Sequence, residues 1–332
     1  MTLRRRKTGL IVTVGLIVIC LTLNMFIPIY NENGIHLEES SRSLANRLEF
    51  IDSLSPASNN SKTLRQIITS GPVYSKVKVI DYEKTAMDTL SASQIIDYLL
   101  WTNQPTCQVA QYFGGRMVTS ADGLSVALDG QKAICLDSAV APIPDQCLVY
   151  SFGISHEWSF DQAMELYGCQ VYAFDPSMNV SDHNRTEAIH FYQMALGDLD
   201  RDGWNEEANV PSRTLSSIYN MLKPLHGGDS IIDYLKMDIE ATEWRVLPQI
   251  IESGMMDKVR QLAVEIHLDY DESLRVYRQQ AGILRSLEDY GMVRFDSKRN
   301  MFTVVDFTQV PGNLAAAVDY EIAWYNSKLM RV

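Results

Sequence analysis

The chain has 332 residues, of which 46% are hydrophobic and 21% charged, the ordinary composition of a folded protein with one large core or two small ones. Its formal net charge is −12, and the basic residues Arg4, Arg5, Arg6 and Lys7 all precede the first long apolar run, so the rest of the chain is more acidic still. Because binding to a phosphate backbone depends on Lys and Arg neutralising phosphates, this balance argues against DNA or RNA as a partner.

The first long apolar run, Leu10 to Ile29, contains no charged residue. At about 1.5 Å per residue it is roughly 30 Å long as a helix, which is the thickness of a bilayer core. It predicts a transmembrane signal anchor at residues 10–30 rather than a cleaved signal peptide, whose apolar region is shorter and ends in small residues. The basic cluster before it favours a single-pass type II orientation. We therefore expect a secretory-pathway protein, in the Golgi, with its folded part in the lumen; an unusually long signal peptide is the alternative.

The segments that follow are expected to differ in kind. Leu37, Leu44 and Ile51 recur every seven residues and predict a short coiled coil in a stem. Apolar spacing in Ala86–Trp101 predicts a helix, and glycine-containing turn pairs between Cys107 and Ala141 predict a looped subdomain. The predicted organisation is a cytoplasmic tail at 1–9, the anchor at 10–30, a stem at 31–85, the looped subdomain at 86–145 and the main domain at 146–332.

The cysteines after the membrane run are even in number, as expected for a chain in an oxidising compartment. Cys147 and Cys169 each begin a strand-like run of the same length, CLVYSFG and CQVYAFD. If these strands are parallel neighbours about 4.8 Å apart, the two sulfur atoms begin side by side. We therefore predict a Cys147–Cys169 disulfide, which leaves Cys107 to pair with Cys135. Sequons at Asn59, Asn179 and Asn184 agree with a lumenal glycoprotein.

From Cys147 onward, strand-like and helix-like patterns alternate. The predicted strands are Cys147–Gly153, Cys169–Asp175, Ile189–Leu196, Ile231–Met237 and Val259–Ile266, and the predicted helices are Glu157–Tyr167, Leu215–Leu222, Trp244–Glu252 and Leu274–Leu287. This alternation predicts an α/β fold with a doubly wound, mostly parallel sheet that has helices on both faces. An antiparallel hairpin of Met292–Phe295 with Met301–Phe307 is expected to close one edge.

Residues suited to ligand binding follow the predicted strands. Ligands of such sheets bind beyond the carboxyl ends of the strands. Gly153 suits a tight turn after the first strand, and Asp175 ends the second, 22 residues later, a spacing at which an acid meets a ribose in dinucleotide folds. Leu196 ends the third strand, where an adenine pocket is expected. Asp238 follows the fourth, with Glu240 and Glu243 next, and Thr242 is expected to N-cap the following helix.

Five motifs carry a family resemblance: FGISHEWSFD, VYAFDPSM, MALGD, LKMDIEATEW and VEIH, in that order. Together they resemble the FkbM-type methyltransferases and, more closely, the methyltransferase-like protein 24 group. The resemblance implies a class I (Rossmann-like) methyltransferase fold and S-adenosyl-L-methionine (SAM) as cofactor, which spacing alone does not identify. Two departures stand out: the glycine-rich G-x-G-x-G of the wider superfamily is reduced to Gly153, and Ala241 stands where the FkbM pattern often has glycine.

The resemblance also implies roles for residues. It puts Gly153 and Ser155 near the methionine part of SAM, Asp175 on the ribose and Leu196 beside the adenine. With their neighbours, the expected cofactor-binding residues are Phe152, Gly153, Ile154, Ser155, Asp175, Pro176, Ala195, Leu196 and Asp238.

Asp238, Glu265 and His267 end the fourth and fifth predicted strands and are the expected catalytic residues. We expect His267 or Glu265 to take the proton of an acceptor hydroxyl and Asp238 to orient the acceptor. The alternative for His267 is an ordinary loop histidine. No metal ligand is assigned, although the same three residues could instead hold Mg²⁺ or Mn²⁺.

The sequence thus predicts a membrane-anchored, SAM-dependent O-methyltransferase that acts on a lumenal acceptor such as a glycan. Two alternatives stay open. One is a catalytically silent binding module with the same fold. The other is a nicotinamide-nucleotide oxidoreductase, against which the missing G-x-G-x-x-G after Cys147 argues.

Overall fold

The computed structural model describes residues 80–103, 106–119, 126–205, 209–300, 303–307 and 314–331. The predicted tail and anchor, the stem up to residue 79 and the sequon at Asn59 lie outside these residues. Within the described residues, no helix is both long and apolar enough to cross a membrane.

The centre of the fold is a sheet with the strand order β13-β16-β12-β11-β5-β6-β8-β7. Strands β12, β11, β5, β6 and β8 are parallel, whereas β16 runs antiparallel to both its neighbours and β7 runs antiparallel to β8. The strands of this sheet are β5 (Leu148–Phe152), β6 (Gln170–Phe174), β7 (His183–Asn184), β8 (Ile189–Tyr192), β11 (Tyr234–Met237), β12 (Gln261–His267), β13 (Met292–Arg299) and β16 (Asp319–Asn326).

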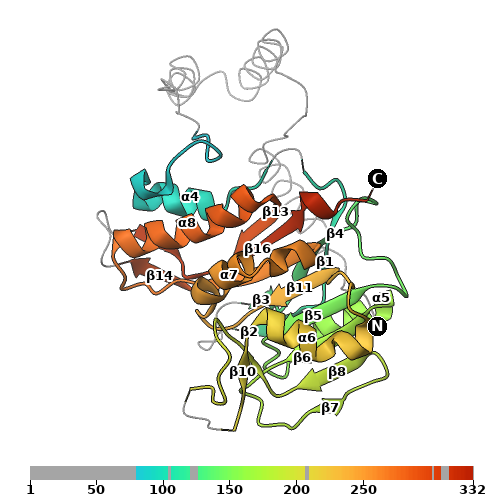
Figure 1. The fold of residues 1–332 in the computed structure, drawn as a ribbon. Helices are drawn as coiled ribbons and strands as arrows, with labels where there is room; N and C mark the ends of the chain where they lie inside the picture. The colour runs from blue at the N-terminus through green and yellow to red at the C-terminus, as the bar shows by residue number, and fades with distance from the viewer. Residues whose placement is uncertain are drawn as a thin grey trace, which may run out of the picture. The chain divides into compact units, whose positions relative to one another are not determined.

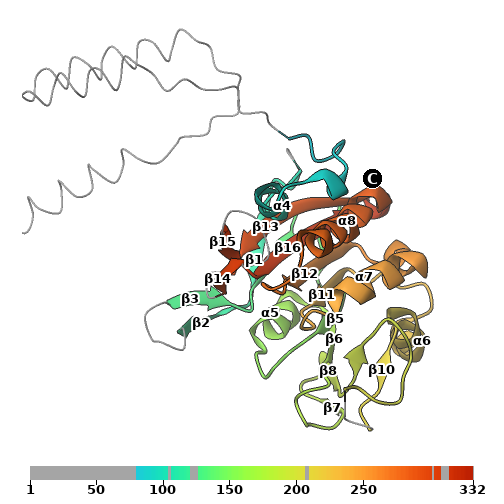
Figure 2. The same cartoon turned by 90° about the vertical axis from the view of Figure 1, so that its left-hand side faces the viewer.

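Helices cover both faces of the sheet. Figure 2 shows α5 on one side of β5 and β6, and α6 and α7 on the other. The α-helices are α4 (Ala92–Leu99), α5 (Ser159–Tyr167), α6 (Leu215–His226), α7 (Glu243–Glu252) and α8 (Leu274–Tyr290), with short 3-10 turns at η1 (Met87–Thr89), η2 (Met255–Lys258) and η3 (Ser327–Leu329). The predicted doubly wound, mostly parallel α/β sheet is confirmed.

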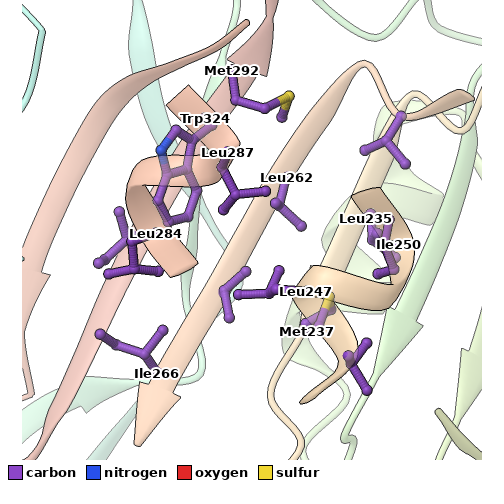
Figure 3. Packing of buried hydrophobic residues seen from close by; sticks show 14 of the residues in the cluster. Leu235, Met237, Leu247, Ile250, Leu262, Ile266, Leu284, Leu287, Met292 and Trp324 are labelled. Carbon is purple, nitrogen blue, oxygen red and sulfur yellow. The ribbon is translucent and has the colours of Figure 1, made fainter. Parts of the chain in front are cut away.

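Alternation along β5 shows why both faces need a cover. Leu148, Tyr150 and Phe152 enter the core beneath α6, α7 and α8, whereas Val149 enters the smaller core beneath α5. Successive residues of a strand point to opposite faces, so an apolar run without polar gaps is buried on both sides. Figure 3 shows the larger core, where Leu235 and Leu262 of the sheet pack near helix residues of α7 and α8 and near Trp324 of β16.

The segment before the first parallel strand joins the same fold. Helix α4 packs on α8, and its Tyr98 and Leu99 belong to the larger core (Figure 1). Strand β4 (Lys132–Cys135) is buried along its whole length and pairs with β1 (Ala110–Phe113). The hairpin of β2 (Arg116–Thr119) and β3 (Val126–Asp129) projects from the body (Figure 2).

The predicted edge hairpin is wrong in its pairing. Strand β13 continues to Arg299 and pairs with β16, while β14 (Val304–Phe307) pairs with β15 (Leu314–Ala317) in a ribbon of its own. Nearness in sequence favoured a hairpin between 292–295 and 301–307, but DYEIAWYN in β16 offers a longer partner that is buried almost throughout. The antiparallel edge therefore exists, with a strand inserted between β12 and β13.

Smaller differences concern where elements end. The strand expected over Ile189–Leu196 is two strands, because the chain leaves the large sheet after Tyr192 and Ala195–Leu196 (β9) pairs in parallel with Ser212–Arg213 (β10). Helix α6 continues past Pro224 to His226, beyond the expected end at Leu222. Thr242 does precede α7, but its side chain makes no capping hydrogen bond.

Both predicted disulfides are confirmed. Cys147 and Cys169 are bonded across the starts of neighbouring β5 and β6, with their Cα atoms 4.7 Å apart. Cys107 is bonded to Cys135 at the end of β4, with a Cα separation of 5.9 Å. The register argument held because the two strands are parallel neighbours, paired from Leu148 with Gln170 onward.

Candidate functional site

The site lies where the chain order of the sheet reverses. From β5 the chain continues to β6 on one side, whereas β11 lies on the other side, and ligands of open α/β sheets bind at such a switch point. Gly153 and Asp238 follow β5 and β11 at this point. A Cβ on Gly153 would lie 1.7 Å from the carbonyl oxygen of Asp238, and the φ of Gly153 is +78°, so only glycine fits here.

Asp175 holds the loop after Gly153. Its Oδ2 accepts hydrogen bonds from the backbone N–H groups of Ile154 and Ser155, at 2.7 and 2.8 Å. Its Oδ1 accepts from the N–H and the hydroxyl of Ser177, both at 2.7 Å. Burial opposes the charge, but these donors outweigh it and lower the pKa of Asp175. The carboxylate borders the cavities described below, and it orders the loop.

Lys236 holds the same loop from the other side. This residue of β11 is buried, and its ammonium donates hydrogen bonds to the carbonyl oxygens of Phe152, at 3.1 Å, and Gly153. The strand and its turn are therefore tied together by a charged side chain in an otherwise apolar run.

A small cavity of about 110 Å³ opens beside Gly153. Its lining is mostly apolar, and Phe152 and Phe174 stack within it with ring centroids 4.6 Å apart. Further lining residues are Pro176, Met194, Ala195, Leu196, Trp204 and Ile239. Such an apolar slot, closed on one side by a glycine that admits no Cβ, suits a flat nucleobase, so the residues present fit the base of a nucleoside cofactor whose remainder extends past Gly153.

A second cavity of about 370 Å³ adjoins the first and shares Gly153, Asp175 and Asp238 with it. Its lining differs, because nearly every side chain is polar or charged. The polar lining residues include Arg116, Asp129, Ser155, Glu157, Glu240, Glu265, His267, Asn300 and Asp319. This cavity suits a hydroxyl-rich ligand better than an apolar one.

Lys132 of β4 organises the floor of the polar cavity. Its side chain is fully buried, and its ammonium lies 3.4 Å from Glu265 Oε2 and 3.7 Å from Asp238 Oδ2 and donates a hydrogen bond to Glu321. Burial opposes the charge, but the three carboxylates hold the pKa of Lys132 well above its usual range. Conversely, burial raises the pKa of Asp238, whereas Lys132 outweighs burial at Glu265 and lowers its pKa.

His267 ends β12 and faces carboxylates through both ring nitrogens. Nδ1 lies 3.3 Å from Oε1 of Glu243, and Nε2 lies 3.9 Å from Asp238 Oδ1 and 3.8 Å from Glu240 Oε2. Burial opposes protonation, but Glu243 outweighs it and raises the pKa of His267 to about 10. The carboxylates around His267 therefore favour the imidazolium over the neutral imidazole.

The turn after Asp238 is strained in a way the sequence hinted at. Glu240 and Ala241 have φ values of 53° and 64°, in the left-handed region that favours glycine. Ala241 is the position where the FkbM pattern often has glycine. Glu240 lines both cavities, and its side chain is 88% exposed.

All the expected site residues lie around these two cavities or next to them. Asp238, Glu265 and His267 come together in the polar cavity, and Phe152, Ala195 and Leu196 line the small one. Ile154 and Ser155 line the polar cavity, and Pro176 lines the small one. Whether they bind a cofactor or catalyse stays a prediction. Glu243, which follows Asp238 in the sequence, accepts a hydrogen bond from Ile239 N–H and is wholly buried beside His267.

Sequence reasoning missed Lys132, Lys236, Asn300, Asp319 and Glu321. Lys236 left a signal, because a lysine inside a buried apolar strand needs a polar partner. Lys132 and Glu321 left none, since β4 and β16 come next to β12 only in the folded chain.

The strand order and the cavity at its switch point define the class: this is a protein with the class I methyltransferase type of α/β fold. A family model described as a methyltransferase domain matches residues 104–310, more than half of the chain, and the chain belongs to this methyltransferase family. The inferred family resemblance is thereby confirmed.

Two relatives carry the name probable methyltransferase-like protein 24. The human protein is 27% identical over 192 residues, which are 55% of this chain and 51% of that protein. The rat protein is 27% identical over 266 residues, 71% of this chain and 65% of that protein. The chain thus matches less than two thirds of the length of either relative.

Proposed function

We propose that this chain is a SAM-dependent methyltransferase that transfers a methyl group to a hydroxyl of a lumenal acceptor, such as a glycan. The observation that carries the proposal is the pair of adjoining cavities that share Gly153, Asp175 and Asp238, one apolar and one polar. Two such compartments suit a nucleoside and an acceptor that must meet at one edge. The methyltransferase family match supports the same reaction class.

The cofactor half is assigned to the small cavity. Phe174 and Leu196 would contact the adenine, Asp175 would fix the loop of Ile154 and Ser155, and Gly153 would allow close approach to the methionine part. SAM supplies an electrophilic methyl group on a sulfonium. The protein contributes mainly by positioning an acceptor oxygen in line with that methyl group.

The acceptor half is assigned to the polar cavity, and we choose a different base from the predicted His267 or Glu265. His267 lies beside Glu243, which raises its pKa, and Glu265 is held by Lys132 and by Asn300, whose side chain donates to it at 3.2 Å. Asp319 also lines this cavity, and among the described residues no lysine forms a salt bridge with it. We therefore assign proton removal to Asp319 and orientation of the acceptor to Asp238.

Membrane anchoring and a Golgi lumen are part of this proposal. They rest on the uncharged run Leu10–Ile29, the preceding basic cluster and two disulfides, which persist in oxidising compartments. The sequon residues Asn179 and Asn184 are exposed, as glycosylation would require. Protease protection in sealed microsomes tests the orientation: the folded domain should be protected until detergent is added.

Calorimetry of the full-length protein in detergent, with SAM and with NAD, tests the cofactor. Binding heat with SAM but not with NAD supports the proposal. Heat with NAD alone would favour an oxidoreductase, and no heat with either would favour a silent binding module. A screen of secreted glycans with radiolabelled SAM then tests the acceptor class, and Asp319→Asn should abolish labelling while SAM binding persists.

A further inference from the structure

One face of His267 is turned toward two carboxylates without a hydrogen bond to either. Nε2 lies 3.9 Å from Asp238 Oδ1 and 3.8 Å from Glu240 Oε2, distances too long for N–H···O bonds. Two atoms that each ligate one metal ion at about 2.1 Å are at most about 4.2 Å apart, so both distances fit ligands of a shared ion. One possible ligand atom from each of the three residues lies within 4.8 Å of the others.

The second observation lies behind the imidazole. A metal-binding histidine usually donates its other ring N–H to a carboxylate, which fixes the orientation of the ring. Here Glu243 is wholly buried, and its Oε1 lies 3.3 Å from Nδ1 of His267. Among the described residues, its Oε2 has no hydrogen-bond partner. A buried carboxylate is costly unless paired with positive charge, and among the described residues His267 is the only basic side chain within 4 Å of Glu243.

The surrounding charges favour Glu240 as the third ligand over Glu265, which the sequence suggested together with Asp238 and His267. Glu265 is engaged by Lys132 at 3.4 Å and by Asn300 at 3.2 Å, so its oxygens already have donors. Glu240 has an exposed side chain at the cavity mouth, and among the described residues His267 is the only basic side chain within 4 Å of its carboxylate. The carboxylates of Asp238 and Glu240 both approach Nε2, and this local negative charge favours a divalent cation, which would bind Nε2 of the neutral imidazole in place of a proton.

We propose that Asp238, Glu240 and His267 bind a divalent cation, with Glu243 holding the imidazole from behind. One imidazole nitrogen and two carboxylate oxygens suit Mn²⁺, which accepts both ligand types and leaves positions open for water or substrate oxygens. Asp238 and Glu240 line both cavities, so the ion would lie at their shared edge. If the proposed methyl transfer is right, the preferred acceptor carries two neighbouring oxygens that can chelate the ion.

The test measures Mn²⁺ itself, by calorimetry and by electron paramagnetic resonance of the full-length protein. Wild type should bind one Mn²⁺ per chain. Glu240→Gln replaces a charged ligand on an exposed side chain and should lower the affinity for Mn²⁺ at least about tenfold. Glu243→Gln leaves the three ligands in place but should lower the affinity for Mn²⁺ about 10- to 100-fold, the usual effect of losing the carboxylate that orients a metal-binding histidine.

Glu252→Gln is the matched control, because Glu252 is an exposed carboxylate at the far end of α7. It should bind Mn²⁺ like wild type. The proposal is overturned if wild type binds no Mn²⁺ or if Glu240→Gln and Glu252→Gln bind it equally. It is also overturned if Asp319→Asn alone loses the ion, since the site would then be Glu265, His267 and Asp319. The heat of SAM binding is measured in parallel. If SAM binds but Mn²⁺ does not, the metal site is overturned and the proposed methyltransferase function is not.

Discussion

The two adjoining cavities, the proposed cofactor half and the proposed acceptor half of the site, are built on different principles. The cofactor half uses elements that are close in sequence, because Gly153 and Asp175 follow β5 and β6 and Leu196 ends β9. The Asp175 carboxylate holds the first loop by accepting hydrogen bonds from the backbone N–H groups of Ile154 and Ser155. The acceptor half uses charged side chains from distant parts, with Lys132 from β4 and Glu321 from β16 on its floor. Local geometry therefore determines the first half, and long-range charge pairing the second.

The largest expected effect tests the backbone-built half. Gly153→Ala would force a Cβ to within 1.7 Å of the Asp238 carbonyl oxygen at a φ of +78°. We expect loss of SAM binding and a fall of more than about 4 kcal/mol in the free energy of unfolding, measured by calorimetry and denaturant titration. Gly282→Ala in α8 is the control: with nothing within 4 Å, it should stabilise the protein by about 1 kcal/mol. Equal behaviour of the two variants would contradict the turn's role.

The next effect tests the charge-built half. Lys132→Met leaves Asp238, Glu265 and Glu321 without their shared cation, and breaking a buried ion pair in this way costs about 3–5 kcal/mol. Denaturant unfolding measures the loss. Lys84→Met, which breaks an exposed pair with Asp81, should leave unfolding unchanged. If both lysines prove equally dispensable, the buried network does not hold the acceptor half together.

The buried carboxyl of Asp161 should give a pH dependence of intermediate size in the free energy of unfolding. Asp161 of α5 is fully buried, and burial, opposed by Lys236, raises its pKa to about 6. A carboxyl with a raised folded-state pKa stabilises the fold below its unfolded pKa of 3.8, and this stability is lost as pH rises through the folded pKa. The loss amounts to about 3 kcal/mol between pH 3 and pH 7.

Asp161→Asn should remove that dependence. Unfolding at pH 4, 5, 6 and 7 should therefore show the variant gaining on wild type as pH rises. Asp229→Asn, which changes a fully exposed carboxyl, should follow the wild-type curve. Parallel curves for wild type and Asp161→Asn would show that Asp161 has an ordinary pKa.

The smallest effect sharpens the account of the cofactor half. Asp175→Asn weakens the hydrogen bonds from Ile154 and Ser155, and bonds to a charged acceptor contribute about 1.5–3 kcal/mol. SAM affinity should fall about 10- to 100-fold in calorimetry while the fold persists. Ser177→Ala removes the hydroxyl, which is one of the two donors to Asp175 Oδ1, and leaves the backbone N–H in place. It should therefore lower SAM affinity by less. A Ser177→Ala defect as large as that of Asp175→Asn would contradict this ranking.

What the sequence could predict follows the same division. Gly153, Asp175 and Leu196 were found because strand ends, spacing and turn chemistry are local patterns. The disulfide of Cys147 with Cys169 was found for the same reason, since equal runs in neighbouring parallel strands fix the register. The cofactor half and the central parallel strands were therefore accessible from residues near one another in the chain.

Long-range pairing was not accessible. The position of β16 depends on burial along both of its edges, which no local pattern reveals, so the predicted hairpin took the nearer strand. Lys132 likewise finds Glu321 only after β4 and β16 meet. The ends of neighbouring strands pointed to His267 or Glu265 as the base, but the pKa of His267 also depends on Glu243, whose burial no local pattern reveals.

The insertion of β16 has a consequence for biosynthesis. The ribosome makes β12 and β13 before β16, so the slot between them stays unfilled until residue 326 has been translated. Until then both flanking strands present unpaired N–H and C=O groups, and such edges invite pairing with other chains. Nascent chains at this stage should depend on chaperones, and Lys132 remains without Glu321 until that last strand closes the gap.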